Sequence, residues 1–325
     1  MNIVRGLPFP SSVQHPVVTI GNFDGQHVGH LALLKVTLDV AHQTGGTPVV
    51  LTFDPHPIQV LKPDVRLQFL STLEQKLQWF KEHGVELAIV LEFSRNFAQL
   101  TPEQFAIQIL QQGIGARAVV VGSHFVFGAK RAGSIDDLRQ LGQAADFHVH
   151  AVLPVHLEDE IASSTRIRQL IQHGHVYEAS RYLGRPYMLS GQVVEGAHRG
   201  EELGCRTANL HLPASRAIPA DGIYATILEW KHQAFYTVSY IGTRPTFGSG
   251  ERILEVHVLD QNIALYGESI HVHFIQWIRG DEKFTSSQDL ARQMSDDVRQ
   301  ARRILETAPF SRTIVGVNAS VDCST

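Results

Sequence analysis

Cysteine is scarce in this chain. Of its 325 residues only Cys205 and Cys323 are cysteines, and they lie far apart. Two distant cysteines do not form the disulfide framework that staples small secreted domains. This content suits a reducing compartment, and we expect a cytoplasmic protein.

The chain also lacks long apolar runs and an excess of charge of one sign. No apolar run approaches the ~20 residues of a membrane-spanning helix, and the N-terminus has no basic-then-apolar signal pattern. The formal net charge of −4 argues against a broad nucleic-acid-binding face but permits a local basic cleft. We therefore expect neither membrane nor nucleic acid as a partner, and a monomer or weak homo-oligomer.

Length and composition favour a globular protein of two domains. Hydrophobic residues make up 43% of the chain and charged residues 18%, as in globular proteins, and 325 residues suffice for two cores. The pattern changes at Leu183-Gly-Arg-Pro-Tyr187, where glycine and proline break a helix. We place the domains at residues 1–185 and 186–310, followed by a tail at 311–325.

Apolar strands alternate with amphipathic helices in the first domain. The strands are expected at Val17–Ile20, Val49–Phe53, Leu87–Leu91, Ala118–Val121 and His148–Leu153. Capping boxes at 71–74 and 101–104 open two of the helices, which glycines 84 and 113 should end. This order predicts a Rossmann-like α/β domain, whose parallel sheet binds ligands beyond the carboxyl ends of its strands.

The most informative stretch runs from Val17 to His30 and reads Val-Val-Thr-Ile-Gly-Asn-Phe-Asp-Gly-Gln-His-Val-Gly-His. A short strand enters a glycine-rich loop, and leucines at helical spacing follow. The helix N-terminus offers unpaired N–H groups and the positive end of the helix dipole, so it favours an anion. His27 and His30 add donors that would stabilise charge developing on a phosphate.

This stretch has three possible interpretations. One is an ordinary strand-to-helix turn with surface histidines. A zinc site is weaker, because metalloprotease helices space histidines i, i+4 around a glutamate and no third ligand is evident nearby. The third is phosphate chemistry on a nucleotide. The string Gly-Asn-Phe-Asp-Gly-x-His-x-Gly-His resembles the nucleotidyltransferase signature of prokaryotic bifunctional riboflavin kinase/FAD synthetases.

This resemblance implies roles for individual residues of the first domain. His27 and His30 would be catalytic, and the loop would bind ATP through Gly21, Asn22, Phe23 and Gly29. Ser163-Ser-Thr-Arg-Ile-Arg looks like the family element that closes on ATP phosphates, which implies phosphate contacts from Ser164, Thr165 and Arg168. The alternative for this element is a simple helix cap with arginines facing solvent.

Two further loops look like the flavin side of the same family. They are Phe-Asp-Pro-His-Pro after the second strand and Gly-Ser-His-Phe-Val-Phe-Gly after the fourth, and they imply flavin contacts from Phe53, Asp54, His56, His124 and Phe125. The first could instead be a rigid turn capped by Asp54. The second departs from the family, which usually has aspartate or asparagine in place of His124 and often arginine in place of Val126.

The second domain reads as strands without intervening helices. Six strands are expected at Leu189–Val194, Ala208–Leu212, Ile223–Glu229, Tyr236–Ile241, Leu254–Leu259 and Ile270–Ile275. Such a series predicts a small antiparallel barrel, on which a terminal helix from Gln288 to Glu306 should pack.

Motifs of this domain resemble riboflavin kinase. They imply ATP contacts from Gly196 and Gly200, magnesium ligands in Thr207 and Asn209, and Glu255 as the base for the ribityl hydroxyl. Singly, Glu255 could be a solvent-facing carboxylate. The family usually reads Gly-aromatic-Pro-Thr-Ala-Asn, whereas this chain has Cys205 and Arg206 before Thr207.

The resemblance implies an enzyme that phosphorylates riboflavin with ATP and Mg²⁺ to FMN and then adenylylates FMN with ATP to FAD and pyrophosphate. Two alternatives remain. The departures at Cys205 and Arg206 would fit an FAD synthetase with an impaired kinase half. With His124 and Val126 they would fit a non-catalytic flavin-sensing protein.

Overall fold

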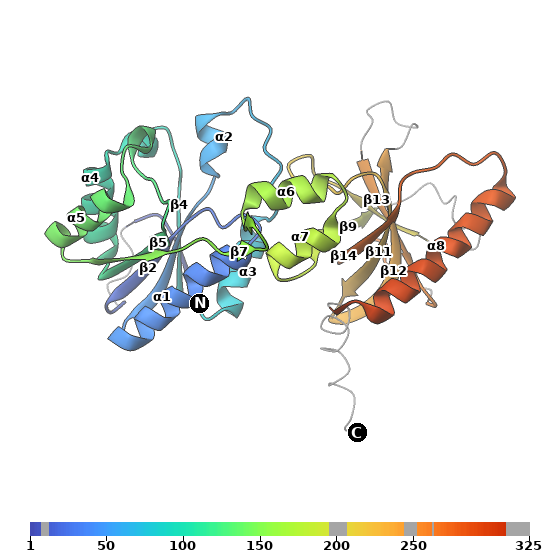
Figure 1. Cartoon of the computed structure of the whole chain (residues 1–325), viewed down its shortest axis with the longest axis horizontal. Coiled ribbons are helices and arrows are strands. Elements are labelled where there is room, and N and C mark those ends of the chain that lie inside the picture. Colours follow the sequence, from blue (N-terminus) through green and yellow to red (C-terminus); the bar gives the residue numbers. More distant parts are fainter. Residues whose placement is uncertain (8–12, 195–206, 244–251, 262, 310–325) are drawn as a thin grey trace, which may run out of the picture. The chain divides into compact units, whose positions relative to one another are not determined.

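The computed structural model describes residues 1–7, 13–194, 207–243, 252–261 and 263–309 (Figure 1). Contacts divide the chain into two compact units, residues 1–164 and 165–325. In chain order the first unit contains β1 (Asn2–Arg5), β2 (Pro16–Ile20), α1 (Val28–Thr44), β3 (Thr47–Phe53), α2 (Pro57–Leu61), α3 (Leu73–Glu82), β4 (Leu87–Leu91), η1 (Phe97–Gln99), α4 (Pro102–Gln104), η2 (Phe105–Ile114), β5 (Ala118–Gly122), η3 (Ala129–Arg131), α5 (Ile135–Ala145), β6 (His148–Val152), β7 (His156–Leu157) and β8 (Glu160–Ile161).

The main sheet of this unit has six parallel strands in the order β1-β4-β3-β2-β5-β6. All five strands expected from the sequence are present, so the predicted α/β class is confirmed. The edge strand β1 is an addition that the sequence analysis missed. Because the strands are parallel, the loops that follow β2, β3 and β5 leave the same edge, and β2 lies where the strand order reverses.

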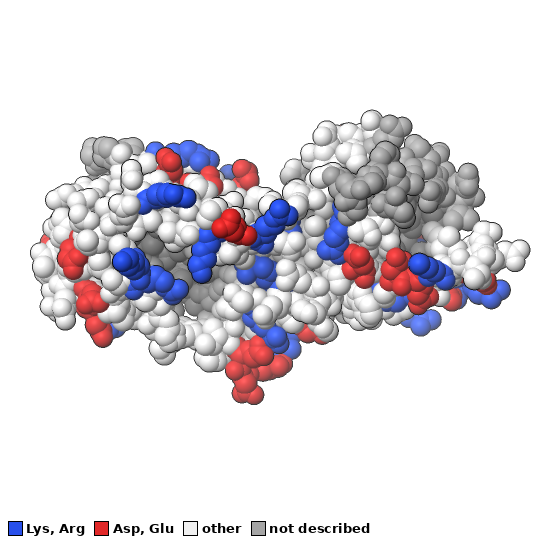
Figure 2. Space-filling model, turned by 90° about the horizontal axis from the view of Figure 1, so that it is seen from above, with Lys and Arg blue, Asp and Glu red and all other residues white. Residues whose placement is uncertain are grey.

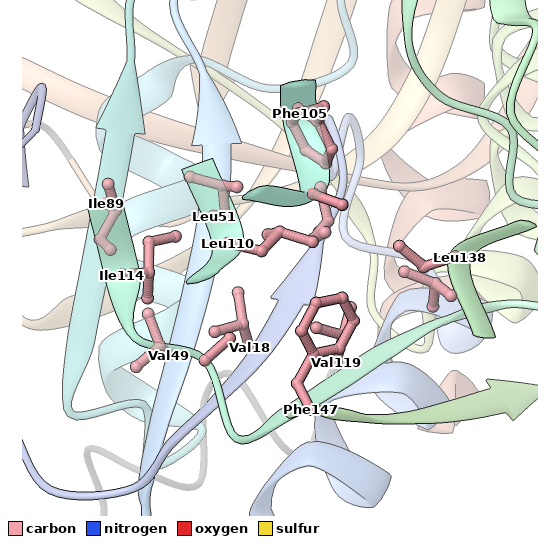
Figure 3. Close-up of a cluster of buried hydrophobic side chains, with 14 of the residues drawn as sticks. Val18, Val49, Leu51, Ile89, Phe105, Leu110, Ile114, Val119, Leu138 and Phe147 are labelled. Atoms are coloured by element: carbon pink, nitrogen blue, oxygen red, sulfur yellow. The ribbon is translucent and has the colours of Figure 1, made fainter. Parts of the chain in front are cut away.

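Helices cover both faces of this sheet. Alternate side chains of the strands pack on η2 and α5, as Figure 3 shows for Val18, Val49, Leu51, Ile89 and Val119 against Leu110, Ile114 and Leu138. The intervening residues face α1 and α3, whose buried side chains include Leu34, Ala41, Trp79 and Phe80. Strands that are buried on both faces are mostly apolar, which is why these segments were readable from the sequence.

Two details of the helix ends differ from the prediction. The capping box of α3 is formed by Thr72 and Gln75, one residue later than expected, with Gln75 N–H donating to Thr72 Oγ1 at 3.2 Å. The helix that begins at Pro102 continues as a π-helix to Ile114, and Gly115, with φ of 69°, ends it. Gly113 lies inside that helix, where a Cβ would come within 2.7 Å of Leu7 Cδ1. Gly113 therefore allows Leu7 to pack closely against the helix and does not end the helix.

The second unit begins in α6. It contains α6 from Thr165 onward (Ser164–Gln172 in full), α7 (Val176–Leu183), β9 (Tyr187–Val194), β10 (Thr207–His211), β11 (Gly222–Trp230), β12 (Gln233–Thr243), β13 (Arg252–Val258), β14 (Ser269–Arg279) and α8 (Ser287–Thr307). The strands close a barrel in the order β10-β13-β12-β11-β14-β9, and every pair is antiparallel. The predicted six-stranded barrel is confirmed.

The predicted terminal helix is also confirmed and packs on the barrel. Ala301 and Leu305 of α8 lie among apolar residues of β11 and β14. A second contact between the barrel and α8 is polar. Arg279, the last residue of β14, donates to both carboxylate oxygens of Asp297 of α8 at 2.9 and 2.8 Å. Asp297 is 4% exposed, so loss of either partner would leave a buried charge and cost about 3–5 kcal/mol.

The described surface carries charges of both signs. Lysine and arginine side chains are interspersed with carboxylates on the face that Figure 2 shows. Within the described part of the chain, no helix combines the length and hydrophobicity that crossing a bilayer would need.

Candidate functional site

The glycine-rich loop between β2 and α1 is held by the segment that precedes α3. Asp24 Oδ1 accepts hydrogen bonds from the N–H groups of Leu70 at 2.9 Å and Ser71 at 3.1 Å. Ser71 Oγ in turn accepts from Gly25 N–H at 3.0 Å and from Gln26 Nε2 at 2.6 Å. Asp24, Gln26 and Ser71 are all buried. Ser71, expected to cap a helix, instead clamps this loop.

The clamp supports an unusual backbone. Phe23 has φ of 50° and Gln26 has φ of 44°, both in the left-handed region that non-glycine residues seldom adopt. The Phe23 ring is fully buried and meets Phe80 edge-on at 5.1 Å. A Cβ at Gly21 would lie 3.1 Å from the Phe23 ring, so glycine gives this ring its place. A strained loop of this kind persists only where its surroundings determine it.

His27 and His30 lie together at the N-terminus of α1. His27 is the N-cap residue, and its Nδ1 accepts from Gly29 N–H at 3.1 Å. His30 Nδ1 accepts from His27 N–H at 3.3 Å, and the two rings stack with centroids 3.7 Å apart. Because Nδ1 is the acceptor in both rings, Nε2 carries the proton of each neutral imidazole. The pair therefore presents Nε2 donors beside a helix N-terminus.

Gly29 and Ser164 complete the surroundings of this pair within the first unit. A Cβ at Gly29 would lie 3.0 Å from His27 Nδ1 and Cε1, so glycine permits the close ring. Ser164 Oγ donates to the Asp24 carbonyl at 2.7 Å, which places Ser164, the residue of the predicted phosphate element in this unit, at the loop. Thr165 and Arg168, which follow on α6, belong to the second unit. Asn22 is half-buried in the loop itself.

Aromatic rings connect the two loops expected on the flavin side. The centre of the Phe53 ring lies 5.7 Å from the ring centres of both Phe93 and Phe97. The Phe125 and Phe127 rings stack with their centres 5.7 Å apart. Phe105 links the two groups, at 6.2 Å from Phe97 and 5.7 Å from Phe127. Sequence reasoning missed Phe93 and Phe97, although Phe93 follows the carboxyl end of β4 and could have been found by that position.

Two of the three polar residues expected on the flavin side, Asp54 and His56, have local partners. Asp54 is exposed and lies 3.6 Å from the Arg5 guanidinium. His56 caps α2, and its Nδ1 accepts from Ile58 N–H at 3.2 Å. His124 is exposed in the loop after β5. Because the loops that carry them follow the parallel strands β3 and β5, the three residues lie at the same edge of the sheet as the glycine-rich loop.

Lys76 is a further charged residue that the sequence analysis missed. It lies on α3 and is only 6% exposed, although lysine is rarely buried without a charged partner. Burial lowers the pKa of Lys76, and the carboxylates of Asp24 and Asp54 act in the opposite direction. The charge of Lys76 is thus within electrostatic reach of both the loop after β2 and the loop after β3. Its only signal in the sequence is its position on the apolar face of α3.

The residues expected in the kinase site share one face of the barrel. Asn209 of β10 lies directly opposite Glu255 of β13, and Thr207 lies opposite His257. Asn209 is 6% exposed and Glu255 is half-buried. On its other side Glu255 faces Tyr240 of β12. Gly196, Gly200, Cys205 and Arg206 lie outside the described residues.

The clustering of side chains that could bind a metal ion bears on the kinase site. Across the described ranges, no group of three or more histidine, cysteine, aspartate or glutamate side chains is arranged to hold a metal ion. Thr207 and Asn209 instead offer a hydroxyl and an amide oxygen on one face of β10. Such oxygens suit magnesium that shares its coordination with phosphates.

Comparison with protein families assigns the two halves separately. A family model described as FAD synthetase matches residues 10–166, and one described as riboflavin kinase matches residues 183–305.

Individual relatives align over nearly the full length. The chain is 33% identical over 306 residues to a bifunctional riboflavin kinase/FMN adenylyltransferase of Escherichia coli (strain K12), covering 93% of this chain and 97% of the relative. It is 34% identical over 306 residues to the enzyme of that name from Pseudomonas fluorescens, with 94% and 98% covered. A crystal structure from Streptococcus pneumoniae, described as a macrolide-efflux protein, matches with a TM-score of 0.85 and 32% identity, covering 92% of this chain and 98% of the other.

Proposed function

Since the chain belongs to the bifunctional riboflavin kinase/FMN adenylyltransferase family, we propose a separate site for each of the two reactions. Adenylyl transfer takes place at the glycine-rich loop between β2 and α1, beside His27 and His30. Phosphoryl transfer takes place on the barrel face that carries Asn209 and Glu255. The chain is an enzyme of both activities, with ATP as the substrate of each and with FMN and FAD as products. The observation that carries the residue assignment is the stacked His27–His30 pair at the N-terminus of α1.

In adenylyl transfer, an FMN phosphate oxygen attacks the α-phosphorus of ATP and pyrophosphate leaves. The Nε2 donors of His27 and His30 bind phosphate oxygens as negative charge builds on them. The backbone around Gly21, Asn22 and Phe23 positions the nucleotide, and Ser164, Thr165 and Arg168 contact its phosphates. The rings of Phe53 and Phe125, with Asp54, His56 and His124, receive the flavin. No covalent enzyme intermediate is needed.

In phosphoryl transfer, the terminal hydroxyl of the ribityl chain attacks the γ-phosphorus of ATP and ADP leaves. Glu255 accepts the proton of that hydroxyl, which makes its oxygen a better nucleophile. The backbone at Gly196 and Gly200 binds the ATP phosphates. Thr207 and Asn209 would hold Mg²⁺ together with the phosphates, and the ion would neutralise part of the phosphate charge.

The proposal extends to the organisation of the chain. We assign adenylyl transfer to residues 1–185 and riboflavin phosphorylation to residues 186–310, with 311–325 as a tail. The matched ranges 10–166 and 183–305 support this division. We further propose a cytoplasmic enzyme that is a monomer or a weak homo-oligomer and that binds neither nucleic acid nor membrane.

One assay tests the proposal. The purified chain is incubated with ATP, Mg²⁺ and either riboflavin or FMN, and the flavins are separated by chromatography. FMN and FAD from riboflavin are the expected products. FAD formed only from supplied FMN would indicate an impaired kinase half, the alternative that Cys205 and Arg206 raise. Tight flavin binding without either product would overturn the proposal in favour of a sensing protein.

A further inference from the structure

We propose that Tyr240 is a positioning residue of the kinase site. It acts by holding Asp281, through a hydrogen bond, next to the strand that pairs with the Glu255 strand. This inference rests on the roles proposed above for Glu255 and Asn209. It concerns a side chain that the sequence analysis did not single out, on the strand next to the proposed base.

The register of three strands sets the order of the groups. Asn209 of β10, Glu255 of β13 and Tyr240 of β12 form one row across the barrel surface. Asn209 borders Glu255 on one side, where the nucleotide and its metal would bind. Tyr240 borders Glu255 on the other side. A base placed between the two should take the acceptor hydroxyl from the Tyr240 side, because the nucleotide occupies the Asn209 side.

The Tyr240 phenol reaches past its own strand to the segment that follows β14. Its ring lies over Gly242, where a Cβ would overlap the phenol carbon and oxygen. Its hydroxyl donates to Asp281 Oδ2 at 3.2 Å. The pKa of Tyr240 is raised to about 12, mainly by burial and next by the Asp281 carboxylate. The phenol therefore keeps its proton at neutral pH and remains a donor.

The segment that holds Asp281 is also fixed at its other side. Arg279, two residues earlier, forms the buried pair with Asp297 of α8. The same guanidinium lies 5.7 Å from the centre of the Phe284 ring. Residues 281–284 are therefore attached to α8 through Arg279 and to β12 through Tyr240. The Tyr240 contact is the one that lies in the row with Glu255, so it fixes the edge of the segment nearest the proposed base.

Steady-state kinetics of riboflavin phosphorylation test this role. Tyr240→Phe removes only the hydroxyl, and we expect the KM for riboflavin to rise roughly five-fold, as for loss of one ordinary hydrogen bond near the surface, with the KM for ATP and kcat nearly unchanged. Tyr236→Phe is the matched control, because Tyr236 lies on the same face of β12 and packs among the apolar residues beneath α8. It should leave both KM values unchanged.

A double-mutant cycle separates positioning from a general structural effect. If Tyr240 acts through Asp281, Asp281→Ala should reproduce the riboflavin effect, and the double variant should be no worse than either single variant. Equal KM values in Tyr240→Phe and Tyr236→Phe, a rise in the KM for ATP instead, or additive effects in the cycle would each overturn the inference. Full FMN formation by Glu255→Gln would remove its premise, whereas an inactive Glu255→Gln leaves these outcomes to decide on Tyr240 alone.

Discussion

His30 supplies the hydrogen-bond acceptor that caps the backbone N–H of His27, while the rings of the two residues stack 3.7 Å apart. The same side chain therefore has a structural contact through Nδ1 and, in the proposed mechanism, a chemical contact through Nε2. These two contacts can be separated by substitution, because glutamine is a common residue at the position that His30 occupies in a capping box.

We expect His30→Gln to keep the cap and lose the chemistry. FAD formation from FMN should fall by about 100-fold or more, as for loss of one preorganised donor to a developing charge. His30→Ala should show the same loss and also lower the free energy of unfolding by about 0.5–1 kcal/mol. Initial rates and urea unfolding measure the two effects. Wild-type FAD formation in either variant would contradict the assignment, and riboflavin phosphorylation should be unchanged in both.

Glu255 offers the corresponding test for the barrel. Glu255→Gln keeps the shape of the side chain but cannot accept the hydroxyl proton, so FMN formation should fall by about 100-fold or more. FAD formation from supplied FMN should not change. Glu229→Gln, a carboxylate replaced on β11, is the matched control and should leave both rates intact. Parallel loss of both activities in Glu255→Gln would argue against two separate sites.

The hydroxyl of Thr19 gives a stability prediction. Thr19 is fully buried on β2, and its Oγ1 has no hydrogen-bond partner among the described residues. Thr19→Val keeps the shape and removes this unsatisfied group, so the free energy of unfolding should rise by about 1 kcal/mol. Thr37→Val is the control, because Thr37 Oγ1 donates to the Leu33 carbonyl at 2.8 Å. Urea unfolding followed by fluorescence compares them, and an equal gain in both variants would refute the explanation.

Glu229 gives a prediction about acid. Its carboxylate lies 3.0 Å from His273 Nε2, and this hydrogen bond, against burial, lowers the pKa of Glu229 below its ordinary value of 4.5. A carboxyl group whose pKa is lowered by folding stabilises the fold above its unfolded pKa, and loses that effect as pH falls through the folded pKa.

Glu229→Gln should therefore be less stable than the wild type at pH 7. The difference should be below about 1 kcal/mol, because the pair is partly exposed. As the pH is lowered below 4.5, the difference should shrink. Unfolding midpoints in urea over a pH series measure it, and a difference that stays constant to the acid end would show that the ionised carboxylate is not its source.

Much of the fold could be predicted because burial leaves a plain pattern. Strands such as Val49–Phe53 are apolar on both faces, and the barrel strands are separated by turns without helices. β1 was missed because it has only four residues, two of them polar, so it shows no clear strand pattern. The cap of α3 was placed one residue early because Ser71 and Thr72 both fit the pattern. Only the loop that Ser71 clamps distinguishes them.

The sequence proposes the residues of the candidate site but does not specify how they are arranged. The spacing of His27 and His30 indicated a shared helix turn, yet their stacking and use of Nδ1 depend on side-chain rotation that a sequence does not specify. Lys76 was missed because a lysine on an amphipathic helix ordinarily points to water. The row from Asn209 to Tyr240 depends on strand register, which residues far apart in the chain determine together.

The hydrogen bond from Ser164 to the Asp24 carbonyl has a practical consequence for dissecting this enzyme by truncation. A fragment that stops at residue 163 would leave that carbonyl without this hydrogen bond and would remove one of the contacts that hold the glycine-rich loop. An N-terminal fragment intended to make FAD by itself should therefore extend past α6, and shorter versions should serve as its negative control.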